Sequence, residues 1–224
     1  MRLEVPDIGA VSALAVSPAR PVAALALAHG AGAGMRHAFM EGLAERLSEH
    51  GVATLRYQFP YLEHGARRPD PPAVATATVR AAAELTRRTF EKAPLFAGGK
   101  SFGGRMSSTA QSEGPVAGVE GLVFFGFPLH PMGRPAMTRA AHLSAIQVPM
   151  LFLQGDRDAL ADPSLIRQTC ERLGPVATLQ MVEGADHSFH VRARSGTTDD
   201  RVLDWLALTA SDWMRRVSAA RQSR

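Results

Sequence analysis

Three short segments of this sequence carry the side chains that acyl-transfer chemistry requires. Residues 99–103 read Gly-Lys-Ser-Phe-Gly, a match to the pattern G-x-S-x-G with Ser101 at its centre. In that pattern the serine stands on a tight, strained turn from a strand into a helix, where its hydroxyl is exposed. Asp158 follows in Gln-Gly-Asp-Arg-Asp (residues 154–158), and His187 follows in Gly-Ala-Asp-His (residues 184–187). A serine nucleophile needs a base, and the base needs an orienting acid, so the order serine, acid, histidine predicts a catalytic triad.

A developing negative charge on the substrate oxygen would also need hydrogen-bond donors. The helix after Ser101 points free N–H groups toward it, which makes the backbone N–H of Phe102 one candidate donor. The glycine-rich loop that follows His29 and Gly30 supplies a second candidate, the N–H of Ala31. The plainer interpretation of this loop is a glycine-rich turn between a strand and a helix.

The same letters around Ser101 allow a competing interpretation as a phosphate loop. Residues 99–101 could end the pattern G-x-x-x-x-G-K-[ST], but that pattern requires glycine at position 94, where this chain has Pro94. Proline also lacks an N–H that would help hold a phosphate. Nucleotide binding is therefore the weaker hypothesis.

The elements that must position these side chains can be read from the hydrophobic periodicity. Short apolar runs predict strands, and stretches with one apolar stripe predict helices. The expected strands cover residues 22–28, 52–57, 95–97, 118–126, 148–155 and 178–182, and the expected helices cover residues 36–50, 74–90, 102–111, 164–173 and 198–217. This alternation predicts an α/β fold in which a mostly parallel central sheet has helices on both faces. No repeat or linker interrupts it, so one domain is expected over residues 1–224.

These segments together resemble the α/β-hydrolase family along almost the whole chain. Residues 28–32, 99–103, 154–158 and 184–187 match its oxyanion loop, nucleophile elbow, acid turn and histidine turn. The chain is most similar to small lidless hydrolases near dienelactone hydrolase, including an uncharacterised bacterial group with a Gly-Lys-Ser elbow. The resemblance implies Ser101 as nucleophile, Asp158 as acid and His187 as base. Dienelactone hydrolase itself has a cysteine nucleophile, so its lactone substrate is not carried over.

The resemblance also bears on two choices within the triad. The family pattern G-x-x-D favours Asp158 over Asp156, which would then stabilise its loop. His187 is favoured over His190 because it lies in the histidine turn itself. Asp186 is a poor orienter of His187, since adjacent side chains usually diverge.

The rest of the cleft is less well specified by the sequence. His37, Phe125, His130 and Met132 are the candidate substrate-binding residues, and core packing is the alternative for the apolar ones. Trp205 and Trp213 are expected in the core. The segment 127–147, where this family inserts a lid, is short, so a minimal lid and an open cleft are expected.

Composition excludes several other classes of protein. The chain of 224 residues is 46% hydrophobic and carries a formal charge of +4, which argues against intrinsic disorder. Its arginines are scattered, and only 6% of residues are aromatic, so nucleic-acid binding is not expected. The basic end, residues 215–224, is expected to fray. The single cysteine, Cys170, cannot form an internal disulfide, and no histidine pair has the spacing of a metal site.

The sequence therefore predicts a cytoplasmic serine hydrolase with no cofactor, no metal and no membrane segment, acting as a monomer or homodimer. Its substrate would be a small molecule with an ester, thioester or similar acyl bond. The alternative is a non-catalytic binding or scaffolding protein on the same fold, because fold alone does not imply function.

Overall fold

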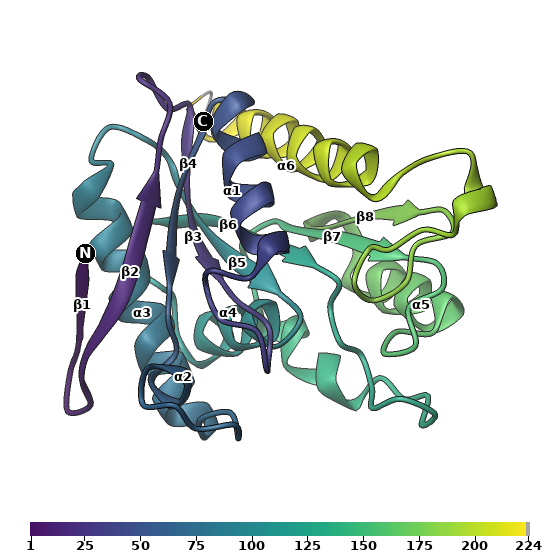
Figure 1. Ribbon diagram of the computed structural model, residues 1–224, viewed down its shortest axis with the longest axis horizontal. Helices are drawn as coiled ribbons and strands as arrows, with labels where there is room; N and C mark the ends of the chain where they lie inside the picture. Colours follow the sequence, from purple (N-terminus) through teal and green to yellow (C-terminus); the bar gives the residue numbers. More distant parts are fainter. Residues whose placement is uncertain (223–224) are drawn as a thin grey trace.

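A single eight-stranded sheet runs through the molecule (Figure 1). The computed structural model describes residues 1–222. The strand order is β1-β2-β4-β3-β5-β6-β7-β8, and all neighbours from β4 to β8 are parallel. The strands are β1 (Arg2–Val5), β2 (Gly9–Val16), β3 (Ala23–Ala28), β4 (Val52–Tyr57), β5 (Leu95–Lys100), β6 (Val119–Phe125), β7 (Met150–Gly155) and β8 (Ala177–Val182).

Helices cover both faces of this sheet, as the alternating pattern predicts. On one face lie α1 (Ala38–Glu49) and α6 (Asp199–Gln222), whose apolar stripes pack in one core cluster with Leu25 and Val123 of the strands. On the other face lie α3 (Pro72–Thr89), α4 (Phe102–Glu113) and α5 (Pro163–Leu173), in a second cluster with Leu122 and Phe124. Adjacent residues of β6 thus point into different cores, which is why central strands of this kind are apolar throughout.

The N-terminal hairpin was not expected from the sequence. Strands β1 and β2 pair antiparallel, and β2 then adds antiparallel to β4 at the edge of the sheet. Their burial alternates, with Leu3 and Val5 inward and Glu4 outward, so they lack the continuous apolar run that marked the inner strands. The loop after β4 also holds an unpredicted one-turn helix, α2 (Pro60–Glu63).

Two expectations about the C-terminal helix are wrong. Trp205 is 37% exposed and belongs to neither core cluster, whereas Trp213 is buried and its indole N–H donates to Thr178 Oγ1 at 3.2 Å. The basic end is helical rather than frayed up to Gln222, and residues 223–224 of that expectation lie outside the described residues. A helix that carries arginines on its solvent face can continue wherever its other face stays packed.

The lid is minimal, as expected. Between β6 and β7 the chain makes a loop and then a 3₁₀ helix, η1 (Thr138–Ala145), which packs against α4. Shorter 3₁₀ segments lie at Gly174–Val176 and Ala193–Ser195. No helix within residues 1–222 is both long enough and apolar enough to span a bilayer.

Candidate active site

The parallel register brings the three motifs to one edge of the sheet. Lys100 at the end of β5 pairs with Phe125 at the end of β6, and Gly155 at the end of β7 pairs with Val182 at the end of β8. The residues that follow these strands therefore emerge at the same edge. This is where open parallel sheets place their ligand sites.

Ser101 stands on a strained turn between β5 and α4. Its φ of 50° and ψ of −114° are rare for a residue with a side chain. The helix can start so close to the sheet because Gly103 has no Cβ, which would lie 2.6 Å from the carbonyl oxygens of both Ala28 and His29. The backbone at Ser101 therefore makes a tight, strained turn from strand into helix.

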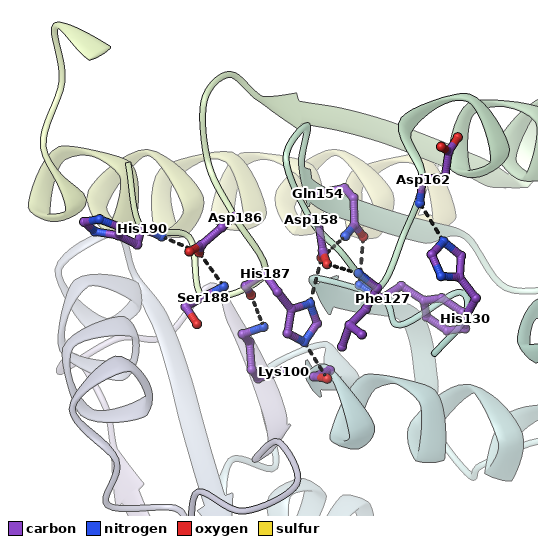
Figure 2. A network of polar contacts seen from close by, with 12 residues as sticks. Lys100, Phe127, His130, Gln154, Asp158, Asp162, Asp186, His187, Ser188 and His190 are labelled. Carbon is purple, nitrogen blue, oxygen red and sulfur yellow. Dashed lines mark hydrogen bonds and ion pairs between the residues drawn. The ribbon is translucent and has the colours of Figure 1, made fainter. Parts of the chain in front are cut away.

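A continuous chain of hydrogen bonds links Ser101, His187 and Asp158. Figure 2 shows the contact between His187 and Asp158. His187 Nε2 lies 2.8 Å from Ser101 Oγ, and His187 Nδ1 lies 2.7 Å from Asp158 Oδ2. The side chain of Asp158 is fully buried, while that of His187 keeps 25% of its surface exposed. A serine hydroxyl in this arrangement can pass its proton to the imidazole, and the buried carboxylate stabilises the resulting cation.

Hydrogen bonds fix both oxygens of the Asp158 carboxylate. Its Oδ1 accepts the N–H of Leu160 at 2.7 Å, and its Oδ2 accepts from Gln154 Nε2 as well as facing His187. Gln154 is itself fixed because its Oε1 accepts the N–H of Phe127 at 2.8 Å. Gln154 is a positioning residue that sequence reasoning missed, although it begins the motif that contains Asp158.

The first aspartate of the acid turn, Asp156, bonds to the neighbouring histidine turn. Asp156 Oδ1 accepts the N–H of Gly184 at 2.8 Å and so ties the acid turn to the histidine turn. The two turns can approach closely because a Cβ on Gly155 would lie 2.3 Å from the carbonyl oxygen of Ala185. The structure thus places Asp158, and not Asp156, against the imidazole.

The histidine turn is held from two directions. Asp186 turns away from the His187 ring, and its Oδ1 accepts the N–H groups of Ser188 at 2.8 Å and His190 at 3.0 Å (Figure 2). Lys100 Nζ, at the end of β5, donates to the backbone carbonyl of His187 at 2.5 Å (Figure 2). These bonds fix the backbone that carries the imidazole.

The ammonium group of Lys100 bonds to the His187 carbonyl, and Lys100 is not among the residues that line the cavity at Ser101. Its ammonium also lies 5.9 Å from the ring centre of Phe39 and 5.4 Å from that of Phe189. Burial lowers the pKa of Lys100 to about 8, and the nearby carboxylates of Asp158 and Asp186 partly oppose that shift. A phosphate loop would need this lysine free to reach a ligand, so its position argues against nucleotide binding.

Beside Ser101 lies a cavity of about 350 Å³. Ala31, Ser101 and Phe102 all line it, so the two candidate oxyanion residues and the serine share one space. Gly30 also approaches the serine closely, since a Cβ on Gly30 would be 3.7 Å from Ser101 Cβ. The remaining lining residues are Pro69, Asp70, Pro72, Arg105, Met106, Pro128, Arg139 and Leu160.

None of the four side chains expected to bind substrate lines this cavity. Phe125 is fully buried in the core, because the end of β6 is covered on that face. His130 is a buried link between loops, with Nε2 accepting the N–H of Asp162 at 2.9 Å and Nδ1 facing the carbonyl of Pro131. His37 is exposed and caps α1, where its ring accepts the N–H of Phe39. Met132 is 72% exposed on its loop.

Apart from Ala31, Ser101 and Phe102, the residues that line the cavity belong to none of the motifs found in the sequence. Arg105 could have been found from the helical period, because it lies one turn after Ser101 on α4. Arg139, Pro128 and Leu160 come from loops and η1, whose course depends on tertiary contacts. Within residues 1–222, no group of three or more His, Cys, Asp or Glu side chains is placed to hold a metal ion. Cys170 is buried away from the site, and burial raises the pKa of its thiol to about 12.

The loop that carries Ala31 depends on a neutral histidine. His29 is fully buried, its Nε2 accepts the N–H of Phe59 at 3.1 Å, and its Nδ1 faces the carbonyl of Gly30 at 2.8 Å. Burial lowers the pKa of His29 to about 4, against the weaker effect of the Gly30 carbonyl. A proton on Nε2 would meet the N–H of Phe59, so protonation opposes this loop structure.

We therefore expect His29 to make the protein sensitive to mild acid. Its pKa is lower in the folded state than in the unfolded state, so unfolded chains bind more protons between pH 6.5 and about 4. The free energy of unfolding should fall by up to about 3 kcal/mol from this residue as pH drops through that window. Urea unfolding at half-unit pH steps measures this.

The matched variants for that experiment are His29→Gln and His64→Gln. The first should flatten the pH dependence between pH 6.5 and 4, because glutamine can accept the Phe59 N–H without titrating. The second, at an exposed histidine, should reproduce the wild-type slope. Identical slopes for wild type and His29→Gln would show that this residue does not control acid stability.

Comparison with known proteins gives a consistent family and fold. Residues 21–215 match the family model described as the alpha/beta hydrolase domain. A dienelactone hydrolase from Anabaena variabilis superposes with a TM-score of 0.76 at 19% identity, covering 96% of this chain and 95% of that one. A serine hydrolase without a lid from Xanthomonas campestris gives 0.70 at 24% identity, covering 96% and 92%.

An esterase domain from Rhodothermus marinus also matches, with a TM-score of 0.70 at 16% identity and coverage of 96% of this chain and 97% of that one. At these identities the structural likeness concerns the fold. The resemblance inferred from the four motifs, and the fold class that it implied, are confirmed.

Proposed function

Because this chain belongs to the alpha/beta hydrolase domain family, we propose that it is a serine hydrolase that cleaves an ester, thioester or similar acyl bond. One observation carries the proposal. The imidazole of His187 bridges Ser101 Oγ at 2.8 Å and Asp158 Oδ2 at 2.7 Å, and Ser101 itself lines a cavity. A binding or scaffolding protein has no need for a serine on a strained turn aligned with a base and a buried acid.

The reaction begins when His187 Nε2 removes the proton of Ser101 and the oxygen attacks the acyl carbon. Asp158 holds Nδ1 protonated and stabilises the imidazolium. The imidazolium then gives its proton to the leaving group, which departs and leaves an acyl group on Ser101. Water activated by His187 attacks this ester and restores the free serine. This chemistry uses side chains and backbone only and calls for no cofactor.

The backbone N–H groups of Phe102 and Ala31 stabilise the oxyanion in this mechanism. Support comes from their common cavity with Ser101 and from the position of Phe102 as the first residue of α4, where helix N–H groups are free. Removal of one such donor costs roughly 10²- to 10³-fold in kcat in other serine hydrolases.

The test is the activity of the wild-type protein on a series of p-nitrophenyl esters from acetate to octanoate. We expect hydrolysis with a burst of one p-nitrophenol per chain wherever deacylation is slower than acylation. A cavity of about 350 Å³ favours short acyl chains. A protein that hydrolyses no ester and takes no label from a fluorophosphonate probe would favour the scaffolding alternative.

A further inference from the structure

Two arginines converge on the wall of the cavity at Ser101. Arg105 lies on α4 one turn after the serine. Its backbone N–H donates to the backbone carbonyl of Ser101 at 3.0 Å, which leaves the guanidinium group free of this bond. Arg139 comes from η1, in the segment that stands in place of a lid. Both line the same cavity as Ser101 and Phe102, although they come from different parts of the chain.

Neither guanidinium has a carboxylate partner. Within residues 1–222, no Asp or Glu oxygen lies within 4.0 Å of Arg105 or Arg139. On the surface, by contrast, Arg87 and Arg88 share Glu84 at 2.9 and 2.7 Å. The Arg105 guanidinium instead lies 5.9 Å from the ring centre of Phe102. Its positive charge is therefore left available on the cavity side.

The two positive charges also act on each other. Burial lowers the pKa of Arg105, and the charge of Arg139 lowers it further. Two like charges that are partly buried and uncompensated raise the free energy of the empty site. An anion between them would remove that cost.

The lining holds one acidic residue, Asp70, whose single negative charge can offset at most one of the two arginines. Asp70 Oδ2 accepts the N–H of Tyr61 at 3.1 Å, and burial raises the pKa of Asp70. Two arginines and one carboxylate leave the cavity wall with a net positive charge. Guanidinium groups bind carboxylate and phosphate oxygens through paired hydrogen bonds, which makes them selective for such groups.

We propose that Arg105 and Arg139 form an anion subsite, so that the substrate is an acyl compound carrying a carboxylate or phosphate group in addition to the bond that is cleaved. This inference rests on the proposed function, because the subsite lies beside the scissile bond only if Ser101 is the nucleophile. The binding of the anion by itself does not depend on catalysis.

The kinetic test compares charged and neutral esters of matched size. One pair places the charge on the acyl side (mono-4-nitrophenyl glutarate against 4-nitrophenyl pentanoate), and the other places it on the leaving group (4-acetoxybenzoate against its methyl ester). We expect kcat/KM to favour the charged member of at least one pair. Arg139→Gln and Arg105→Gln should each reduce that preference about tenfold, the loss expected for a charge-assisted hydrogen bond. Sodium chloride at 0.5 M should also reduce it.

The matched control is Arg201→Gln, which removes the same charge at an exposed position of α6 on the opposite face of the sheet. It should leave the preference unchanged. Arg139 is the primary target because it lies on a short surface element, and equal melting temperatures would show that a variant is folded. If wild type cleaves the neutral esters without preferring either charged one, the anion subsite is wrong while the proposed hydrolase function remains.

A binding experiment tests the anion subsite independently of the proposed hydrolase activity. Glutarate and inorganic phosphate are titrated against wild type and Arg139→Gln while the melting temperature is recorded. A rise with either ligand that Arg139→Gln abolishes supports the subsite even in a protein that cleaves no ester, and the ligand that acts identifies the anion. No rise with either ligand, together with no charged-ester preference, would overturn the proposal.

Discussion

Replacement of Ser101 by alanine is expected to lower kcat on the best p-nitrophenyl ester by at least about 10⁴-fold. The reason is that, within residues 1–222, Ser101 Oγ at 2.8 Å is the only hydroxyl in hydrogen-bond contact with His187 Nε2. The variant should also lose all labelling by a fluorophosphonate probe, which is read as a mass increase of the intact protein. Residual activity would come from the oxyanion donors and from binding alone.

The control for this experiment is Ser48→Ala, which removes a hydroxyl from α1 on the other face of the sheet. That variant should label and turn over like wild type. The Ser101→Ala protein should remain folded, because within residues 1–222 the Ser101 hydroxyl bonds to His187 alone. A Ser101→Ala protein that still takes the label, or that keeps more than about a tenth of the wild-type rate, would exclude Ser101 as nucleophile.

Replacement of Asp158 by asparagine is expected to lower kcat by about 10⁴-fold, with a smaller effect on KM. Both carboxylate oxygens of Asp158 accept hydrogen bonds, from Leu160 on one side and from Gln154 and His187 on the other. An amide must turn its NH₂ group toward one of these sides. Either a buried donor then faces a donor, or the imidazole changes tautomer and can no longer accept the serine proton.

Asp156→Asn is the matched control, since it makes the same change two residues away. Asparagine can still accept the N–H of Gly184 through its carbonyl oxygen, so this variant should keep kcat within about threefold of wild type. Equal losses in the two variants would mean that the acid turn as a whole, and not Asp158, supports the imidazole. A large loss in Asp156→Asn alone would reverse the assignment.

Local sequence was sufficient for the inner part of the fold. Strands β3 and β4 and helices α1 and α4 could be predicted from apolar runs and stripes. The buried face of a strand or helix consists of apolar residues, which recur in the sequence with the period of that element. The hairpin β1–β2 was not predicted, because its residues alternate between buried and exposed and because β2 pairs antiparallel with β4, a segment distant in sequence. Long-range pairing leaves little mark on local composition.

The order of Ser101, Asp158 and His187 along the chain, each just after a strand, could be read from the sequence, because a tight elbow and two turns after strands require particular residues at particular spacings. The surroundings of these three residues depend on tertiary packing. It placed Phe125 and His130 in structural roles and brought Arg105 and Arg139 to one cavity wall. The physical reason is that motifs are local in the chain, whereas a binding cavity is lined by loops whose positions depend on how distant elements pack.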